Sequence, residues 1–236
     1  MKPIAVFRLY KIEGPGYLAT LFDSQSIPWK LIKLDKGEGL PQNLKDYSGL
    51  VFMGGPMSAN DNLPVISGAF GLIRQAIRYN IPVMGHCLGG QMLSKALGGK
   101  VYSSPVKEMG WGTVTVASSI IASEWFDNLY NFEAFHWHGE YFTLPEDAHR
   151  ILSSKYCNNQ AFISGPHIGM QCHLEVTENM IRAWYETGAD EIANSLGPGV
   201  QSLEVVQKNL AERVSNINKV ARYLYLKWVS QLTVLK

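Results

Sequence analysis

The sequence predicts an α/β fold in which a mostly parallel central sheet is flanked by helices. Short apolar runs at 4–7, 49–53 and 81–84 are typical of strands that are buried on both faces. An amphipathic helical pattern at 64–79 separates the second run from the third. Strands that alternate with helices over short loops indicate parallel pairing through right-handed crossovers.

The other elements of the amino-terminal part follow the same alternation. A Gly-Pro-Gly loop follows the first strand, and a helical pattern at 17–22 comes after it. Residues 29–34 alternate apolar with lysine side chains and are predicted to form a second strand. The run at 81–84 leads into another helical pattern, which Gly98 and Gly99 end as glycines commonly do.

After residue 100 the pattern changes to short strands separated by Gly, Pro and Ser turns, which predicts an antiparallel or mixed section. These strands are expected at 101–103, 112–116, 134–142, 151–152 and 161–163. A buried strand is predicted at 168–174, and Thr177 is suited to cap a helix that runs to Tyr185.

The chain is predicted to form one main domain with a helical extension. Gly197-Pro198-Gly199 interrupts the chain, and residues 200–232 then carry a long amphipathic helical pattern. We therefore expect a domain at 1–195 and a helical extension at 196–236. The extension is expected to pack on the domain or to form an interface with a partner or a second copy, which leaves a homodimer open.

Composition narrows the class of function. The formal net charge of +1 over 236 residues gives no footprint for nucleic acid or for an anionic membrane. No stretch approaches the roughly 18 apolar residues that span a membrane, and we expect no signal peptide before the first strand. Three cysteines indicate a reducing cytoplasm rather than a disulfide framework. Cys and His pairs of the kind that bind zinc are lacking, so we expect no metal and no cofactor.

The stretch Gly85-His86-Cys87-Leu88-Gly89 joins the third apolar run to the helix behind it. A strand, a Gly-X-Cys-X-Gly turn and a helix form the thiol version of a nucleophile elbow, in which the glycines let strand and helix pass close to a strained central residue. The start of a helix is also expected to lower the pKa of Cys87. The alternative is that Cys87 is a small buried apolar residue. The side chain of His86 should point away from Cys87.

A cysteine nucleophile needs a base and a group that orients the base. His173 lies at the end of a buried strand pattern and is followed at the second position by Glu175. Residues i and i+2 of an extended segment point the same way, so the carboxylate can reach the imidazole. The alternative is a core histidine beside a solvated carboxylate.

Acyl transfer also needs N–H groups that hold the oxyanion of the tetrahedral intermediate. Leu88, directly after the cysteine, offers one N–H at the start of the helix. Gly54-Gly55-Pro56 follows a neighbouring apolar strand and could offer a second N–H, from Gly55. The alternative is an ordinary turn that ends the strand.

Three motifs in this order resemble the class I, triad-type glutamine amidotransferase family, and above all the glutaminase domain of GMP synthetase and its free-standing relatives. They are Gly54-Gly55-Pro56, the stretch from Gly85 to Gln91, and Cys172-His-Leu-Glu-Val-Thr177. The resemblance covers roughly residues 4–185. It implies a flavodoxin-like α/β sandwich and hydrolysis of a γ-glutamyl amide through a thioester.

The resemblance also implies roles for individual residues. Cys87 would be the nucleophile, His173 the general base and then acid, and Glu175 the group that orients it. The amides of Gly55 and Leu88 would form the oxyanion hole.

The resemblance further implies a binding site for the substrate. Gln91 matches a family glutamine that helps to bind it. The segment 135–140, with His136, Trp137 and His138, resembles a Ser-His-Gly-Asp stretch whose backbone holds the α-amino and α-carboxylate ends. Trp137 replaces the serine and Glu140 the aspartate. The aromatic ring could restrict the pocket or line a site for a larger substrate.

Three functions remain open from the sequence. The first is a glutaminase that supplies ammonia to a separate synthase or works alone, because no ATP-binding loop of the Gly-x-x-x-x-Gly-Lys type is present. The second is a γ-glutamyl peptidase that cleaves γ-glutamyl dipeptides or glutathione-like substrates with the same triad. The third is a binding module on this fold without turnover.

Overall fold

The computed structural model describes residues 1–127, 129–195 and 197–232. Its strands are β1 Ile4–Arg8, β2 Trp29–Lys33, β3 Gly49–Phe52, β4 Val83–His86, β5 Val101–Val116, β6 Asn131–Phe142, β7 His149–Ser154, β8 Ala161–Ser164 and β9 His167–Met170. Its α-helices are α1 Gly16–Ser24, α2 Pro64–Arg78, α3 Leu88–Ala96, α4 Ile120–Phe126, α5 Glu178–Thr187, α6 Ala189–Asn194, α7 Leu203–Gln207 and α8 Leu210–Leu232. Two short 3₁₀ turns lie at Leu34–Lys36 and Leu44–Asp46.

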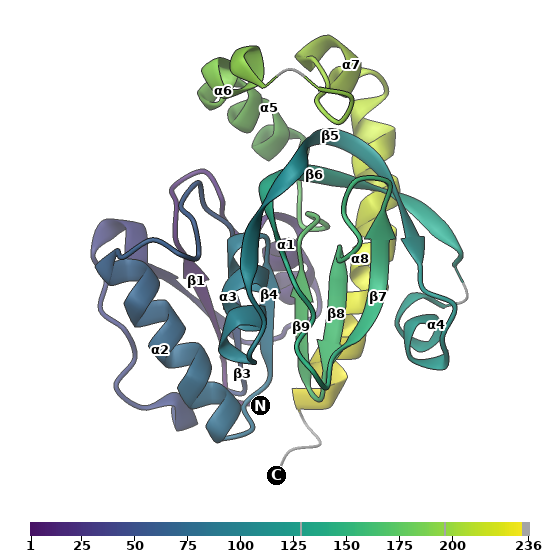
Figure 1. Cartoon of the computed structure of the whole chain (residues 1–236). Helices are drawn as coiled ribbons and strands as arrows, with labels where there is room; N and C mark the ends of the chain where they lie inside the picture. The colour runs from purple at the N-terminus through teal and green to yellow at the C-terminus, as the bar shows by residue number, and fades with distance from the viewer. Residues whose placement is uncertain (128, 196, 233–236) are drawn as a thin grey trace.

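Within these described ranges the nine strands form one mixed sheet in the order β2-β1-β3-β4-β9-β8-β7-β5-β6 (Figure 1). From β2 to β9 every neighbouring pair is parallel, and from β9 to β6 every pair is antiparallel. The α/β fold, with a parallel sheet and an antiparallel section after residue 100, is confirmed. The antiparallel section is as large as the parallel one, since β9 stands at the centre of the order.

The sheet differs in detail from the elements that the sequence predicts. β5 is one strand where two were expected, and a register shift between Ser103 and Glu108 marks the predicted gap. β9 ends at Met170 instead of 174, because the chain beyond it pairs with the sheet only through a single bridge from His173 to Phe135. The short helices α4 and α6 had no clear periodic signal.

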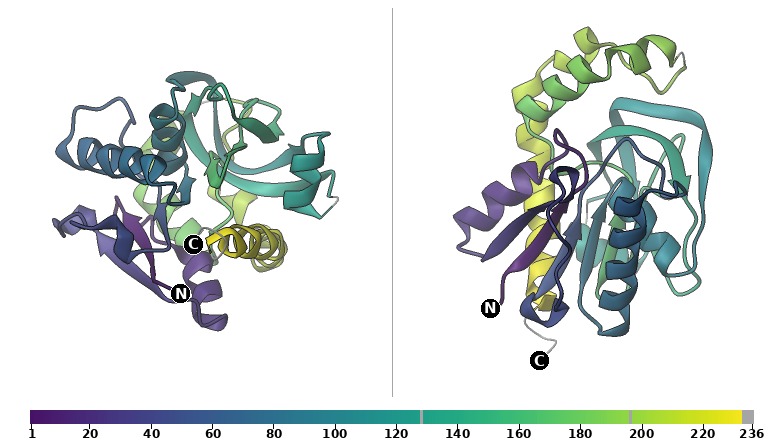
Figure 2. Two further views of the ribbon diagram at one scale, coloured as in Figure 1. Left: turned by 90° about the horizontal axis from the view of Figure 1, so that it is seen from below. Right: turned by 90° about the vertical axis from the view of Figure 1, so that its left-hand side faces the viewer.

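Each face of the sheet has its own core, as the alternation along β1 shows. Ile4 and Val6 point into a core that α1, α4, α5 and α8 cover, whereas Ala5 and Phe7 point into a core that α2 and α3 cover. The right-hand view of Figure 2 shows α1 and α8 on one side of the sheet and α2 on the other. The helices therefore flank the sheet on both faces, as predicted.

The carboxyl-terminal helix α8 packs along one face of the sheet and belongs to the same core as α1 and α4 (Figure 1). Its apolar stripe includes Tyr225 and Trp228, both fully buried. The ring of Trp228 comes so close to the start of β3 that a side chain at Gly49 would lie 2.9 Å from it. The described part of the predicted extension thus packs on the main domain, while residues 196 and 233–236 lie outside the described residues.

Four neighbouring parallel strands bring the site residues to one edge. β1, β3, β4 and β9 are adjacent in the sheet, and their carboxyl ends lead into the loops that carry Glu13, Gly55, Cys87 and His173. Sites of open α/β sheets lie at this edge because the loops after parallel strands converge there. No helix within the described ranges is both long and apolar enough to cross a membrane.

Candidate active site

Cys87 stands between β4 and α3 with a backbone conformation that side chains rarely adopt, at φ 47° and ψ −108°. Its N–H donates to the carbonyl of Met170 over 2.7 Å, which ties the turn to β9. Side chains at Gly85 and Gly89 would collide with the backbone of the helix start and with the Phe52 carbonyl, respectively. The predicted elbow is therefore present, and both glycines are required by close approach of backbone to backbone.

The thiol of Cys87 is almost buried, with 6% of the residue exposed. The side-chain amide of Gln171 lies 3.5 Å from Sγ, and the carbonyl of Trp137 lies 3.8 Å from it. Burial raises the pKa of Cys87, and interaction with His173 acts in the opposite direction. The net shift of the Cys87 pKa is therefore upward, opposite to the direction expected from the helix start, and burial is its largest cause.

His173 and Glu175 form a buried pair, in which Nδ1 of the imidazole lies 2.7 Å from Oε1 of the carboxylate. The backbone N–H of His173 donates to the Phe135 carbonyl over 2.8 Å. The ring of Trp184 packs edge-on against the imidazole, with the two ring centroids 4.7 Å apart. Burial alone would lower the pKa of His173, but the charge of Glu175 and the contact with Cys87 raise it well above its usual value. The structure thus brings the three predicted triad residues together.

The second oxygen of Glu175 faces a further buried pair. It lies 3.8 Å from Nε2 of His86, and the same nitrogen lies 2.9 Å from the hydroxyl of Tyr225 on α8. Burial lowers the pKa of His86 and raises that of Tyr225 well above its usual value, so both groups are held neutral. His86 is not among the residues that line the cleft with Cys87, and its side chain contacts Glu175 instead.

Gly55 and Leu88 lie side by side, since a side chain at Gly55 would come 3.1 Å from the Leu88 side chain. Gly55 lines the same cleft as Cys87. Leu88 is the first residue of α3, whose leading N–H groups have no acceptor inside the helix. Among the described residues, the N–H of Gly55 is not used in a backbone hydrogen bond. Gly55 and Cys87 thus face the same cleft, and the oxyanion hole stays a prediction.

Gln91 lies on α3 one turn beyond Cys87 and lines the cleft. Its amide donates to Oε1 of Gln171 over 3.2 Å, and the amide of Gln171 in turn faces Cys87. Gln171 was not predicted, although it directly precedes the Cys172-His173 motif. The two glutamines form a polar wall beside the thiol.

The segment around Trp137 lines the cleft through Trp137, His138, Gly139 and Glu140. The indole of Trp137 packs against Tyr185 at 5.0 Å and donates to Glu191 of α6 over 3.2 Å. Glu140 accepts from the hydroxyl of Ser58 over 2.9 Å.

His136, by contrast, is not among the residues that line the cleft. Its side chain is buried against strand β5, with Nε2 3.4 Å from the Gly112 carbonyl. We therefore do not retain it as a residue that contacts substrate through its side chain.

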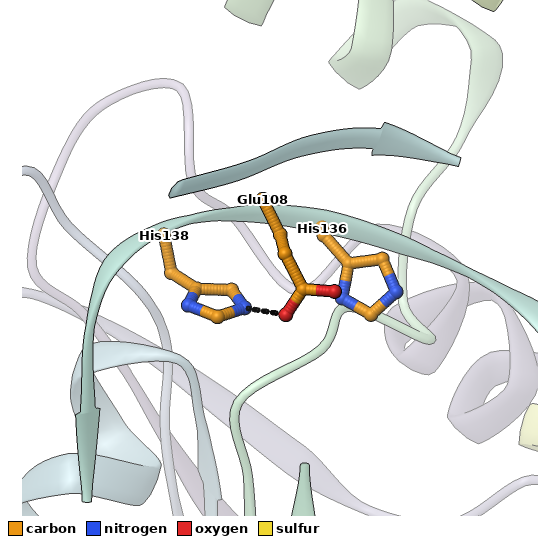
Figure 3. A group of neighbouring side chains, drawn as sticks. All are labelled: Glu108, His136 and His138. Carbon is orange, nitrogen blue, oxygen red and sulfur yellow. Dashed lines mark ion pairs between the residues drawn. The ribbon is translucent and has the colours of Figure 1, made fainter. Parts of the chain in front are cut away.

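Glu108 on β5 and the two histidines His136 and His138 on the neighbouring strand β6 form a buried cluster (Figure 3). Their ligand-type atoms lie within 4.8 Å of one another. The carboxylate of Glu108 already accepts from Ser154 over 2.7 Å and from Gln160 over 2.8 Å, and it lies 3.2 Å from Nε2 of His138. A carboxylate so engaged supports the cleft wall through His138 and offers little to a metal ion.

The cleft has a volume of about 330 Å³, at the lower end of the roughly 300–1,000 Å³ typical of small-molecule sites. Lys107 lines it and is paired with Glu191 at 3.0 Å. Glu13, from the loop after β1, also lines it and was not predicted. Burial raises the pKa of Glu13 to about 7, and nearby His173 opposes this shift. In the sequence, the one feature that points to Glu13 as a site residue is its position after the carboxyl end of a predicted parallel strand.

A cysteine on an elbow beside a buried histidine–carboxylate pair is an arrangement typical of enzymes that attack carbonyl groups through a thioester. Residues 21–185 match the family model described as glutamine amidotransferase class-I. This match spans more than half of the chain, and the chain therefore belongs to the class I glutamine amidotransferase family. Family membership supports hydrolysis of the glutamine amide as the general activity.

Two relatives show how far the sequence likeness extends. The glutamine amidotransferase-like protein YfeJ of Salmonella typhimurium is 29% identical over 179 residues, which cover 73% of this chain and 74% of that protein. One subunit of the glutamine-hydrolysing GMP synthase of Sulfolobus acidocaldarius is 30% identical over 138 residues, which cover 57% of this chain and 71% of that subunit.

Solved structures resemble the whole chain. A glutamine amidotransferase from Methylobacillus flagellatus aligns with a TM-score of 0.94 at 38% identity and covers 98% of this chain and 95% of its own. A glutamine amidotransferase from Thermotoga maritima aligns with a TM-score of 0.86 at 29% identity and covers 96% and 97%. These alignments include the helical extension, which is therefore a shared part of the fold.

Proposed function

We propose that the protein hydrolyses the γ-amide of L-glutamine through a γ-glutamyl thioester on Cys87. The observation that carries this proposal is the position of Cys87 on a strained elbow, at the floor of a small cleft and in electrostatic contact with the buried His173–Glu175 pair. Strain of this kind persists only where the surrounding structure enforces it, and it is often found at reactive residues.

In the first half of the reaction, His173 takes the thiol proton and the sulfur of Cys87 attacks the γ-carbonyl carbon. The tetrahedral intermediate collapses when the carbon–nitrogen bond breaks and the imidazolium gives its proton to the departing amine. Glu175 fixes the imidazole by holding Nδ1, which leaves Nε2 to exchange protons. Among the described residues, Nε2 makes no hydrogen bond that would compete with its exchange of protons with Cys87.

The backbone N–H groups of Gly55 and Leu88 are assigned the role of binding the oxyanion of each intermediate. Two backbone donors in a site with little water stabilise the developing charge, and removal of one such donor typically costs about 100- to 1,000-fold in rate. The start of α3 adds its helix dipole at the same point.

In the second half, a water molecule attacks the thioester carbonyl. His173 takes a proton from this water and returns a proton to the departing thiol, so that glutamate is released and Cys87 is regenerated. The catalytic groups return to their initial protonation states, and no cofactor enters the cycle.

The acyl end of the substrate is assigned to the wall formed by Gln91 and the segment from Trp137 to Glu140. Polar groups here include the Gln91 amide, the carboxylate of Glu140 and the backbone of Gly139. A zwitterionic α-carbon needs both donors and acceptors, and this wall offers both.

The ammonia that is released is proposed to pass to a separate acceptor protein. One relative is named as part of a glutamine-hydrolysing GMP synthase, which suggests a synthase partner for this chain as well. The free, buried thiols of Cys157 and Cys172 fit a reducing, cytoplasmic setting.

The proposed function is tested by release of glutamate from L-glutamine and, separately, from γ-glutamyl dipeptides, with Cys87→Ala as the inactive control. We expect glutamine to be the better substrate and Cys87→Ala to release no glutamate from either. Higher kcat/KM on dipeptides would identify a γ-glutamyl peptidase, and turnover by Cys87→Ala would overturn the proposed chemistry. Absence of any turnover in the intact protein would support the binding-module alternative.

A further inference from the structure

Glu13 is a carboxyl group in the cleft that the proposed mechanism does not use. It lies in the loop between β1 and α1 and lines the cleft together with Cys87. Its backbone N–H donates to the Tyr10 carbonyl, but no other described residue forms a hydrogen bond or an ion pair with its side chain. Even a half-buried carboxylate is costly unless something compensates it, so this position needs an explanation other than fold stability.

The carboxyl group of Glu13 lies close to the imidazole of His173. A methyl group added at Gly54 would collide with a carboxyl oxygen of Glu13 and would lie 3.4 Å from Cε1 of His173. Cε1 is bonded to both ring nitrogens, and one of them, Nε2, must protonate the departing amine. The Gln91 wall takes the acyl end of the substrate, so the Glu13 side is left for the leaving group.

The other charged groups of the cleft do not offset the charge of Glu13, so the Glu13 side of the cleft discriminates between leaving amines by their charge. Lys107 is the one lysine or arginine among the described residues that line the cleft, and it is already paired with Glu191. A leaving amino acid would bring its own carboxylate toward Glu13 and would find no free cation to bind it. Two like charges about 4 Å apart repel by ~1 kcal/mol even at the dielectric constant of water, and by more in a cleft.

We propose that Glu13 determines which leaving amines this site accepts: ammonia and amines with a positively charged tail are favoured, and amino acids with a free carboxylate are disfavoured. This inference rests on the proposed function and narrows its substrate class to γ-glutamyl amides of ammonia and of cationic amines. It also gives a physical reason why the same triad would discriminate against γ-glutamyl dipeptides.

The test uses three γ-glutamyl amides of nearly equal size, whose leaving amines are propylamine, 1,3-diaminopropane and β-alanine. These carry a neutral, a positive and a negative tail, respectively. At pH 8 we expect kcat/KM for the cationic amide to exceed that for the anionic one by at least about tenfold, with the neutral amide between them. Glu13→Gln should reduce this ratio to within about threefold, because the repelling charge is removed.

The matched control is Glu204→Gln, which removes the same charge from an exposed position on α7 and should keep the wild-type ratio. An equal kcat/KM for the cationic and anionic amides in the wild-type protein would overturn the proposal. So would a Glu13→Gln variant that weakens all three amides equally, since that result would place Glu13 at the α-ammonium group of the substrate.

A second measurement separates this proposal from the proposed function. Binding of the same three amides to Cys87→Ala is measured by calorimetry, where no turnover is needed. If the order of affinity follows the charge of the tail but the intact protein turns over none of the amides, the selectivity of Glu13 stands and the catalytic proposal fails. If turnover depends on Cys87 but neither rates nor affinities follow the charge of the tail, the catalytic proposal stands and the selectivity of Glu13 fails.

Discussion

The hydroxyl of Tyr225 lies 2.9 Å from Nε2 of His86, the residue that directly precedes Cys87. The same nitrogen lies 3.8 Å from Glu175, which holds the imidazole of His173. Tyr225 belongs to α8, so the helical extension reaches the catalytic pair through a single buried histidine. We therefore expect the extension to help position Glu175 in addition to covering the sheet.

We expect Tyr225→Phe to lower kcat by about two- to tenfold, the cost of one hydrogen bond, with KM nearly unchanged. The ring stays in place, but His86 loses its partner and Glu175 is less firmly held. Steady-state kinetics on glutamine at 25 °C measure both constants. Tyr223→Phe on the exposed face of the same helix is the control, and equal kcat values for the two variants would contradict the positioning role.

Glu175→Gln should lower kcat by about 100- to 10,000-fold, because an amide in this place no longer stabilises the imidazolium or its tautomer. The loss should be smaller than that of His173→Ala, since Glu175 orients the base and does not itself react. The double variant should be no worse than His173→Ala alone if the residues act as a unit. Losses that multiply in the double variant would show that Glu175 acts independently of His173.

Gly89→Ala tests the geometry of the elbow. The added methyl group would collide with the carbonyl of Phe52, so we expect the free energy of unfolding to fall by about 1–3 kcal/mol and activity to fall with it. Gly71→Ala is the matched control in an exposed turn of α2 with open space around it, and should stabilise by about 0.5–1 kcal/mol. Urea unfolding measures both, and an unaffected Gly89→Ala protein would contradict the close approach of β3 and α3.

Glu13 should make stability depend on pH. Its pKa of about 7 in the folded protein lies above the ordinary value of 4.5, so the folded state binds the proton more tightly than the unfolded state does. The cost of ionising the group is absent below about pH 4.5, grows as the pH rises, and is fully present above about pH 7. Glu13→Gln should therefore be more stable than the wild-type protein at pH 8, by at most about 3 kcal/mol, and should gain nothing at pH 4.5.

Denaturant unfolding at the two pH values measures this difference, with Glu204→Gln as the control for loss of one exposed negative charge. The gain should be smaller than the full value because Glu13 is partly exposed and solvent screens it. A gain that is the same at pH 4.5 and pH 8 would show that the carboxyl group of Glu13 keeps an ordinary pKa.

The parts of the site that the sequence predicts are those fixed by local geometry. Cys87 with its two glycines is a local turn, and the spacing of His173 and Glu175 follows from two residues of extended chain. The parallel strands could be predicted because each is an apolar run between helical patterns. For the same reason the strained turn at Cys87 and the His173–Glu175 pair agree with the structure.

The residues that the sequence does not reveal depend on long-range packing. Tyr225 is 139 residues from His86, and nothing in an amphipathic helix marks one tyrosine as its partner. Glu13 sits in an irregular loop, where a carboxylate is usually solvated. The predicted direction of the Cys87 pKa shift is wrong because the helix start is visible in the sequence, whereas the surrounding burial is not.

The central claim is that a γ-glutamyl group is transferred to the sulfur of Cys87, and the most direct test is to trap it. The protein is mixed with L-glutamine, quenched in acid during turnover and analysed by mass spectrometry, with Cys157→Ala as the control for a second buried thiol. We predict a mass increase of one glutamyl group on the peptide that contains Cys87, in the wild-type and Cys157→Ala proteins alike. Glutamate release that continues in Cys87→Ala, or an adduct on another residue, would contradict the account.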